Sequence, residues 1–377
     1  MNPFDQITRP TLLIDQARCQ ANITRMAAAA RAARVRFRPH FKTHQSAAVG
    51  EWFRQAGVER ITVSSVDMAE YFAAHGWTDI TIAFSMNVRQ VEAVNRLARQ
   101  VRLGLLVESP ETAAFLRERL TADVDAWIKV DVGAGRTGLA WDAPAAAAAL
   151  AGEVNRGGAH LRLAGLLTHA GHSYRARGEE QIRQVYAESS GRLRGLKAQL
   201  EQAGLRGLEL SFGDTPCCSV VDDFSGLDEI RPGNFVFFDV TQVIIGSCRE
   251  TDLAVGLACP VVARHPARGQ VILYGGAVHL AAQALVENGR SLYGWAALPA
   301  GTGWGPAVPG AYLSALSQEH GILNAPPALL EQLQVGDLVI VLPVHSCLTA
   351  DLMPGYLNLN PPEGAPAWLP KMGKTGR

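Results

Sequence analysis

One lysine of this sequence lies in a strongly cationic stretch, with two histidines and two arginines close to it. The stretch reads Arg36-Phe37-Arg38-Pro39-His40-Phe41-Lys42-Thr43-His44. Neighbouring positive charges and partial burial both disfavour an ammonium ion, so we expect the Lys42 amine to lose its proton readily. A neutral amine is a nucleophile that forms Schiff bases with carbonyl compounds. A basic surface loop is the alternative interpretation, and this segment alone does not exclude it.

A second segment with chemical potential is Pro343-Val344-His345-Ser346-Cys347, which follows an apolar, strand-like run. Side chains two positions apart on an extended segment point to the same side, so His345 and Cys347 are expected to lie together. Both are good zinc ligands, and a site with only two protein ligands keeps positions open for water and substrate. The alternative is a hydrogen-bonded histidine beside a buried cysteine.

The order of apolar and helical segments indicates the scaffold that must hold these residues. From Gln16 to about residue 240, short apolar segments alternate with segments of helical spacing. The predicted strands are Val35–Arg38, Ile61–Ser64, Ile80–Phe84, Leu103–Val107, Ala126–Val132, Leu163–Leu167, Leu208–Phe212 and Asp228–Arg231. Because helices are the usual connection between parallel strands, this pattern predicts a (β/α)8 TIM-type barrel. A doubly wound open sheet is the alternative, although no Gly-x-Gly-x-x-Gly motif opens the first helix.

A barrel of this kind carries its chemistry at the carboxyl ends of its strands. The fifth predicted strand ends in a glycine-rich turn that delivers Arg136. This arginine alone could be an ordinary surface charge, but its place after the strand end favours contact with a ligand. The sixth strand runs into a segment that contains His169 and Tyr174. Either of these two side chains could equally be partly buried and bonded to the backbone.

The seventh predicted strand is followed by Gly213, Asp214 and Thr215, which we interpret as a phosphate cradle. A glycine lets the backbone come close, and neighbouring N–H groups with the threonine hydroxyl can bind an anion. A tight turn capped by Asp214 is the alternative for this segment. The eighth strand leads into Arg231-Pro232-Gly233-Asn234.

The sequence after about residue 240 has a different texture, with short strand-like segments separated by turns rich in glycine and proline. We therefore expect a barrel over residues 16–240 and a mostly β C-terminal domain over residues 241–377. The strand at residues 11–15 precedes the first helix and is expected to join the second domain.

The bulk composition excludes several classes of protein. The chain has 377 residues and a formal net charge of zero, which argues against binding to nucleic acid or to an anionic membrane. The segment Met1–Pro10 carries charges and has no apolar core, so we expect no signal peptide. Six scattered cysteines show no disulfide or zinc-ribbon spacing, so a reducing cytoplasm is the expected compartment.

Taken together, the motifs resemble the D-serine dehydratase and D-threonine aldolase family. That family belongs to the fold-type III pyridoxal-phosphate enzymes, which include alanine racemase. The resemblance covers essentially the whole chain. It rests on the order and spacing of six segments: Arg38–His44, Thr168–Gly171, Ser211–Pro216, Arg231–Asp239, Gln318–Gly321 and His345–Cys347.

The resemblance implies a cofactor, a metal and their ligands. Lys42 would carry pyridoxal 5'-phosphate and also act as the catalytic base, with His44 as a second candidate catalytic residue. The residues implied to bind the cofactor are Lys42, Arg136, His169, Tyr174, Gly213, Asp214, Thr215 and Asn234. His345 and Cys347 would bind a divalent metal, Zn2+ or else Mn2+ or Mg2+. The similar enzymes are homodimers in which the β domain of one subunit covers the barrel mouth of the other.

The resemblance also narrows the reaction to D-configured β-hydroxy amino acids. A His-x-Cys pair is similar to the dehydratase members, whereas aldolases more often have His-x-Asp, so we expect D-serine or 3-hydroxy-D-aspartate to yield a 2-oxo acid and ammonia. A D-threonine-type aldolase and an amino-acid racemase are the alternatives. A non-catalytic pyridoxal-phosphate carrier is disfavoured because such carriers lack a β domain. The segment Tyr274–His279 departs from the Asp-Ala-Gly of many relatives, so substrate contacts there are expected to differ.

Overall fold

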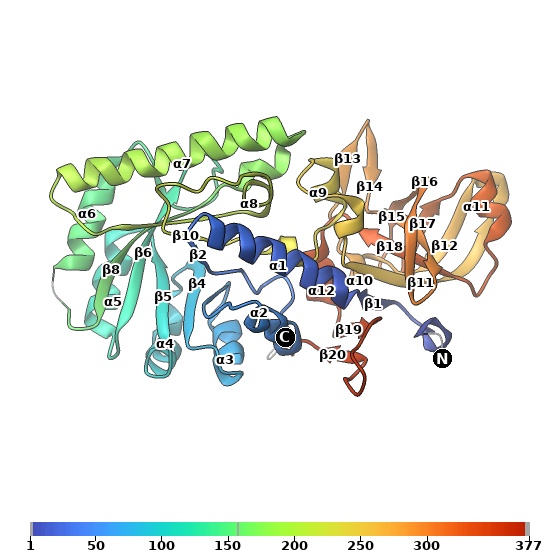
Figure 1. The fold of residues 1–377 in the computed structure, drawn as a ribbon, viewed down its shortest axis with the longest axis horizontal. Helices are drawn as coiled ribbons and strands as arrows, with labels where there is room; N and C mark the ends of the chain where they lie inside the picture. The colour runs from blue at the N-terminus through green and yellow to red at the C-terminus, as the bar shows by residue number, and fades with distance from the viewer. Residues whose placement is uncertain (1–2, 157, 374–377) are drawn as a thin grey trace. The chain divides into compact units, whose positions relative to one another are not determined.

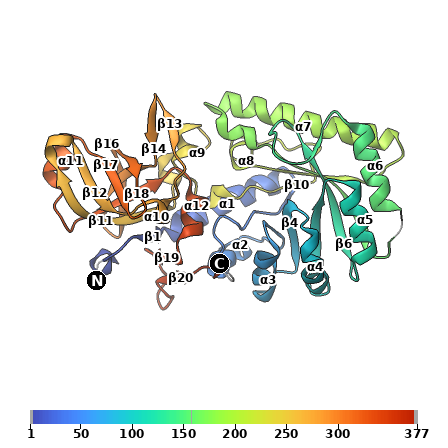
Figure 2. The same cartoon turned by 180° about the vertical axis from the view of Figure 1, so that it is seen from behind.

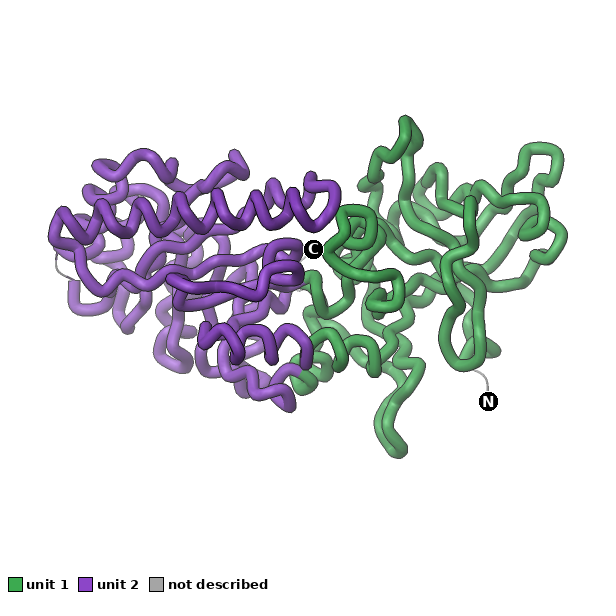
Figure 3. The backbone as a smooth tube through the Cα atoms, turned by 45° about the horizontal axis from the view of Figure 1, so that its top comes forward, with its two compact units in different colours: residues 1–23, 43–52, 234–377 green, residues 24–42, 53–233 purple. Residues whose placement is uncertain are grey.

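The computed structural model describes residues 3–156 and 158–373 of the chain, which fold into two compact units (Figure 3). Residues 24–42 and 53–233 form one unit, which we call the barrel unit. The other, the β unit, comprises residues 1–23, 43–52 and 234–377. Parts of two sequence predictions lie outside the described residues: the first two residues of Met1–Pro10 and the last four of the C-terminal domain.

Eight parallel strands form the wall of the barrel unit (Figure 1). They are β2 (Arg36–Phe37), β3 (Ile61–Val63), β4 (Asp79–Ser85), β5 (Arg102–Val107), β6 (Val124–Asp131), β8 (Leu161–His169), β9 (Glu209–Gly213) and β10 (Glu229–Ile230). Their order is β2-β10-β9-β8-β6-β5-β4-β3, and a parallel bridge between His40 and Thr62 joins the two ends. The expected (β/α)8 barrel is therefore confirmed, and the open doubly wound sheet is wrong.

Helices connect these strands and lie on the outer face of the curved sheet (Figures 1 and 2). They are α3 (Val66–Ala74), α4 (Val91–Ala98), α5 (Pro110–Arg119), α6 (Pro144–Asn155), α7 (Glu179–Gln202) and α8 (Thr215–Val220), and the unit boundary falls within α1 (Gln16–Ala32) and α2 (Ala47–Gln55). Serine side chains start two of them: Ser65 accepts from the Met68 N–H at 3.2 Å, and Ser109 accepts from the Thr112 N–H at 3.2 Å. Such caps satisfy N–H groups that have no partner within the helix.

The β unit is a mostly antiparallel nine-stranded sheet that closes on itself. Its strands are β1 (Thr11–Ile14), β11 (Val255–His265), β12 (Gln270–Tyr274), β15 (Gly294–Ala300), β16 (Gly303–Leu316), β17 (His320–Asn324), β18 (Leu338–Pro343), β19 (Gly355–Asn358) and β20 (Trp368–Pro370). β11 pairs with β18 over residues 257–260 and with β12 over residues 261–265, which closes six strands into a ring. The expected second domain of mostly β structure is thereby confirmed.

The remaining elements of the β unit are short. β1 pairs antiparallel with β11 and parallel with β19, so the N-terminal strand belongs to this sheet. A separate hairpin consists of β13 (Leu285–Glu287) and β14 (Arg290–Leu292), and the helices are α9 (Val240–Ile244), α10 (Ala277–Leu280), α11 (Pro327–Gln332) and α12 (Ser346–Leu352). No described helix combines the length and the apolar character that crossing a membrane requires.

Candidate active site

Lys42 lies in the turn that follows β2, with its side chain exposed. Its backbone N–H donates to Nδ1 of His40 at 3.4 Å. Because Nδ1 accepts this bond, the neutral His40 ring carries its proton on Nε2. Burial, followed by the charges of Lys42 and Arg231, holds the pKa of His40 well below its ordinary value of 6.5. His40 is therefore a neutral hydrogen-bond donor next to the lysine.

His169, at the end of β8, has the opposite tautomer. Its Nδ1 lies 2.7 Å from the carbonyl oxygen of Gly213, which can only accept, so Nδ1 carries the proton and Nε2 keeps a lone pair. Burial and then the charges of Lys42 and Arg136 lower the pKa of His169 well below 6.5. The Tyr174 ring lies with its centroid 6.2 Å from that of His169. The barrel unit thus places one donor imidazole and one acceptor imidazole near Lys42.

The turn that presents Arg136 is built by a carboxylate. Asp131 accepts hydrogen bonds from the backbone N–H groups of Gly133, Ala134 and Gly135 at 2.8–2.9 Å. Gly133 and Gly135 have φ of +128° and +70°, which residues with side chains rarely adopt. The exposed Arg136 follows directly, and its charge acts on both His40 and His169. The predicted arginine therefore belongs to the same group as Lys42.

The predicted phosphate cradle is a capped helix start. Asp214 accepts from the Cys217 N–H at 2.7 Å and from the Ser173 hydroxyl at 2.9 Å, and so begins α8. Burial raises the pKa of Asp214 to about 6 despite these hydrogen bonds, and its second oxygen has no partner in the described structure. The Thr215 N–H reaches the Tyr174 hydroxyl at 3.5 Å. Cap and cradle, which the sequence offered as alternatives, involve the same residues.

Packing inside the barrel gives a reason for glycine at position 213. A Cβ at this position would lie 2.9 Å from the backbone oxygen of Arg231 and 3.0 Å from its Cβ. The close neighbour is therefore the chain of the adjacent strand end. Glycine is required because β9 and the residue after β10 pass too near each other for a side chain.

The charge of Arg231 acts on His40, beside Lys42; the sequence interpretation quoted this arginine but assigned it no role. It is 4% exposed, and its Nε donates to the Ser211 hydroxyl at 2.6 Å while Nη2 donates to the carbonyl oxygen of Thr168. The sequence signal available for this arginine was its position directly before Pro232-Gly233, at the end of the eighth predicted strand.

These barrel residues fit a phosphorylated aldehyde. Lys42 offers an exposed amine, and Arg136 and Arg231 bring positive charge to the same end of the barrel.

The second cluster, in the β unit, surrounds the thiol of Cys347. The Thr43 hydroxyl lies 3.4 Å from Sγ, and the Asn234 amide nitrogen donates to it at 3.5 Å. Burial alone would raise the pKa of this thiol. The hydrogen bond and the charge of His345, together with the hydrogen bonds of Thr43 and Asn234, nevertheless leave that pKa below its ordinary value of 9.0. A stabilised thiolate is the form of cysteine that binds metals.

His345 and Cys347 lie together, but not on an extended segment as we expected. β18 ends at Pro343. His345 occupies the position just before α12, without a capping hydrogen bond from its side chain, and Cys347 is in the first turn of that helix. His345 Nδ1 lies 2.8 Å from Oε1 of Gln283, which fixes the ring in the way seen for metal-bound histidines. The nitrogen and sulfur donors fit a zinc-type ion. The described residues contain no group of three or more His, Cys, Asp or Glu that could complete a closed site.

Asn234, predicted to bind the cofactor, lies in this second cluster. Its amide nitrogen donates to Asp239 at 2.7 Å and to the Ser346 hydroxyl at 2.9 Å, as well as to Cys347. Its buried amide oxygen has no partner among the described residues. Asp239 also accepts from the Ser346 N–H at 3.1 Å, so Asn234 and Asp239 together fix the start of α12.

His44, a candidate catalytic residue, is fully buried. Its Nδ1 accepts from the Ser46 N–H at 3.2 Å, and the Tyr356 hydroxyl donates to the His44 carbonyl oxygen at 2.5 Å. Burial lowers the pKa of His44 to about 3, so the ring is neutral. A ring with no exposed surface is poorly suited to contact a substrate, and these bonds make it a support for the turn after Lys42.

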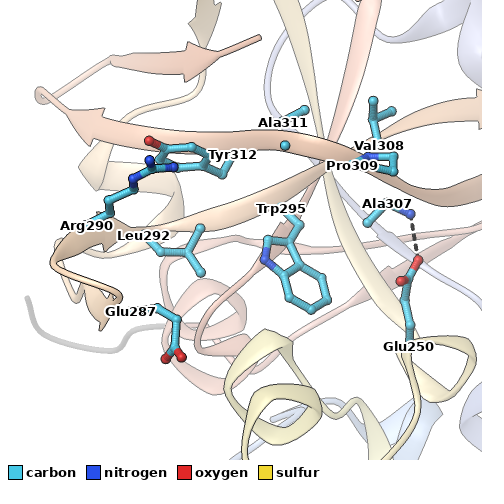
Figure 4. A pocket seen from close by; sticks show the side chains of 11 residues that line it. Glu250, Glu287, Arg290, Leu292, Trp295, Ala307, Val308, Pro309, Ala311 and Tyr312 are labelled. Carbon is cyan, nitrogen blue, oxygen red and sulfur yellow. Dashed lines mark hydrogen bonds between the residues drawn. The ribbon is translucent and has the colours of Figure 1, made fainter. Parts of the chain in front are cut away.

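The β unit also has a cavity of about 380 Å³, which none of the predicted site residues lines (Figure 4). Trp295, Leu292 and Tyr312 form its apolar wall, and Arg290, Glu287 and Glu250 add charges at its rim. Glu250 accepts from the Ala307 N–H at 2.6 Å and so fixes one edge of β16.

Comparisons with known proteins agree with the two-part architecture. Residues 14–240 match the alanine racemase N-terminal domain, and residues 254–359 match a serine dehydratase domain. D-threo-3-hydroxyaspartate dehydratase from Delftia sp. (strain HT23) is 32% identical over 95% of this chain and 96% of its own. D-serine dehydratase from Dictyostelium discoideum is 22% identical over 95% and 94% of the two chains.

Solved structures of relatives also share both parts of this architecture. The Delftia dehydratase superimposes with a TM-score of 0.89 at 29% identity, covering 98% of this chain and 99% of that one. The same relative has been solved as a cysteine-to-alanine mutant in a metal-free form and as a histidine-to-alanine mutant. The two substituted positions are two residues apart, as His345 and Cys347 are. By the match over residues 14–240 and the near full-length identity to the dehydratase, this chain belongs to the alanine-racemase-like family of fold-type III pyridoxal-phosphate enzymes, in the branch that contains the D-serine and D-3-hydroxyaspartate dehydratases.

Proposed function

We propose that this chain is a lyase that dehydrates a D-β-hydroxy amino acid, 3-hydroxy-D-aspartate or D-serine, to a 2-oxo acid and ammonia. The observation that carries the proposal is the His345–Cys347 pair, whose spacing equals that of the two substituted positions in the Delftia dehydratase. The hydrogen bonds around the thiol add support, because they favour the metal-binding thiolate.

Pyridoxal 5'-phosphate is the proposed cofactor; when bound, it withdraws electrons from Cα of the attached amino acid and makes the Cα–H bond acidic. The Lys42 amine attaches the cofactor and then removes the Cα proton. Arg136 and the start of α8 at Asp214 and Thr215 hold its anionic groups. His169, with its Nε2 lone pair, is oriented to accept a hydrogen bond there.

A divalent metal, Zn2+ or else Mn2+ or Mg2+, is the second proposed component; when bound, it polarises the β-hydroxyl so that this group can leave. The His345 imidazole and the Cys347 thiolate hold it, and Gln283 keeps the imidazole in one orientation. Hydrogen bonds from Asn234 and Thr43 to the sulfur favour its thiolate form. We also propose a homodimer, by analogy with the family.

The test is a product assay on a panel of 3-hydroxy-D-aspartate, D-serine and D-threonine. We expect 2-oxo acid as the dominant product from one of the first two substrates. Glycine with an aldehyde would instead assign an aldolase, and the L-enantiomer a racemase; either result contradicts the proposal.

Two pairs of variants assign the residues. Lys42→Ala should abolish both the visible absorbance of bound cofactor and the activity, while Lys197→Ala, a lysine on α7, should change neither. Cys347→Ala should lose dehydratase activity and keep the cofactor absorbance, with Cys248→Ala as its matched control. EDTA should reproduce the Cys347→Ala result, and added zinc or manganese should reverse it in the wild type. Full activity after metal removal would contradict the role of the pair.

A further inference from the structure

Helix α9 begins beside the segment that carries His345, and two side chains at its start hold the backbone of that segment. Asp239, which caps α9, accepts a hydrogen bond from the Ser346 N–H at 3.1 Å. The Thr241 hydroxyl, in the first turn of α9, donates to the carbonyl oxygen of Val344 at 2.6 Å. Val344 and Ser346 are the residues on either side of His345. The histidine is therefore fixed through both of its neighbours, which bind to the same helix.

The side chain of Ser346, which lies between His345 and Cys347 in the sequence, is held as well. Its hydroxyl accepts from the Asn234 amide nitrogen at 2.9 Å and lies 3.4 Å from Oδ2 of Asp239. Ser346 has no exposed surface. The residue that links the two proposed metal ligands is thus anchored by its backbone and by its side chain.

Asp239 also decides which way the Asn234 amide faces. Its Oδ2 lies 2.7 Å from the Asn234 amide nitrogen. A carboxylate can only accept, so the reverse orientation of the amide would bring two oxygen acceptors together. In the orientation that Asp239 requires, the same amide nitrogen donates to Cys347 Sγ at 3.5 Å. The carboxylate therefore acts on the sulfur through the amide.

A carboxylate buried at this place has a reason other than the capping of a helix. Asp239 is 3% exposed, and burying a charge is unfavourable unless hydrogen bonds satisfy it. A serine or threonine would cap α9 without a charge. Only a carboxylate offers two oxygens that both accept. Oδ1 receives the Gln242 N–H of α9 at 3.1 Å, which leaves Oδ2 for Asn234 and Ser346.

The small number of ligands makes this support important for metal binding. Within residues 3–156 and 158–373, no group of three or more His, Cys, Asp or Glu side chains could hold a metal ion. The affinity of an ion held by His345 and Cys347 alone depends on the placement of both side chains. Groups that orient metal ligands commonly change metal affinity for this reason.

We propose that Asp239 and Thr241 are positioning residues for the divalent metal. They hold the backbone on both sides of His345, and Asp239 directs the Asn234 amide toward the Cys347 sulfur. The inference rests on the proposed function in one respect, that a divalent metal binds this pair. It adds Thr241, which lies between residues 14–240 and 254–359, the two segments that match known domains.

The experiment measures Zn2+ binding by calorimetry to the full chain after EDTA treatment and removal of the EDTA by dialysis. Thr241→Val removes the hydroxyl at nearly constant volume, and Thr241→Ser keeps it. Asp239→Asn retains a capping side chain for α9 but no longer fixes the orientation of the Asn234 amide. We expect Thr241→Val and Asp239→Asn each to raise the Kd for Zn2+ by about tenfold or more, and Thr241→Ser to keep the wild-type Kd.

Controls separate positioning from general damage. The Thr11 hydroxyl also donates to a backbone carbonyl oxygen in the β unit, that of Arg9 at 2.9 Å, so Thr11→Val is the matched control and should leave the Kd unchanged. If Thr241→Val lowers only the unfolding temperature, or if Thr241→Ser binds Zn2+ as weakly as Thr241→Val, the positioning role is wrong. If Asp239→Asn does not fold, the comparison of the two Thr241 variants decides alone.

The wild-type protein separates this inference from the proposed function. A wild-type chain that binds no Zn2+ would overturn the proposed metal site together with this inference. Wild-type binding of Zn2+ with an unchanged Kd in Thr241→Val and Asp239→Asn would overturn this inference alone.

Discussion

Replacing the buried Arg38–Glu229 pair, singly and together, tests how the barrel interior tolerates charge. The two side chains are 6% and 0% exposed, and 2.7 Å separates Arg38 Nε from Glu229 Oε2. Removing one member of such a pair leaves an uncompensated buried charge, which costs about 3–5 kcal/mol. We therefore expect Glu229→Leu and Arg38→Met each to lower the free energy of unfolding by about that amount.

The double variant should cost clearly less than the sum of the two. Without Glu229, Arg38 loses its buried partner; without either, an apolar pair of similar size remains. The expected coupling energy is about 2–3 kcal/mol, measured by urea unfolding of all four proteins at one pH. Some loss should remain in the double variant, because Asp79 and Arg231 also lose a neighbour. Additive effects within about 0.5 kcal/mol would refute the idea that the two charges stabilise each other.

The Arg38–Glu229 pair also makes the free energy of unfolding depend on pH in the acid range. Burial would raise the pKa of Glu229, but Arg38 outweighs it, and the folded-state pKa lies below the ordinary 4.5. A lowered folded-state pKa contributes stability above pH ~4.5 that is lost as the pH falls through the folded value. The wild type should therefore lose stability below pH ~4.5 more steeply than the Arg38→Met, Glu229→Leu double variant. Equal slopes would contradict this account.

Three further outcomes follow from the site geometry. Burial holds the pKa of His44 at about 3, against 6.5 when unfolded, so the free energy of unfolding should fall as the pH drops below 6.5. By pH 3 this loss is worth up to ~4 kcal/mol. Urea unfolding at a series of pH values should show a smaller loss for His44→Asn. Thr43→Val removes one donor to the Cys347 sulfur, so the pH midpoint for alkylation of that thiol in metal-free protein should rise by about one unit, and Thr43→Ser should not raise it. Gly213→Ala would place a Cβ 2.9 Å from the Arg231 carbonyl oxygen and should destabilise the barrel by about 1–3 kcal/mol in thermal or urea unfolding; an unchanged stability would mean that the strands can separate there.

The barrel could be predicted because most of its strands are short, largely apolar runs between helical segments. The predicted strands Val35–Arg38 and Leu103–Val107 correspond to β2 (Arg36–Phe37) and β5 (Arg102–Val107). Each observed end lies within one residue of the predicted end. Such runs are buried on both faces, so their pattern depends little on distant residues. Because the strands were predicted correctly, their carboxyl ends also predicted that Lys42, Arg136 and His169 lie at the same end of the barrel.

The surroundings of Cys347 could not be predicted, because they come from distant parts of the chain. Thr43 and Asn234 are 304 and 113 residues away in sequence, and neither belongs to a metal-binding motif. The extended path assumed for His345 and Cys347 was wrong because α12 begins immediately after β18, with no serine, threonine or aspartate to mark its cap. By contrast, α8 carried a visible signal in Asp214 followed by Thr215-Pro216, the usual cap and first-turn proline of a helix.

Charged side chains in the barrel wall follow the same spacing by two as the side chains of an apolar strand face. Arg36 and Arg38 near β2, and Glu229 and Arg231 near β10, are spaced by two, the period that brings side chains to one face of a strand. The sheet register pairs Glu229 with Arg36 on one side and with Ser211 on the other, so these residues form one row across three strands. A row of charges in a barrel interior often gives less stability than an apolar row of similar size, so the apolar pattern that predicts a strand does not predict this row.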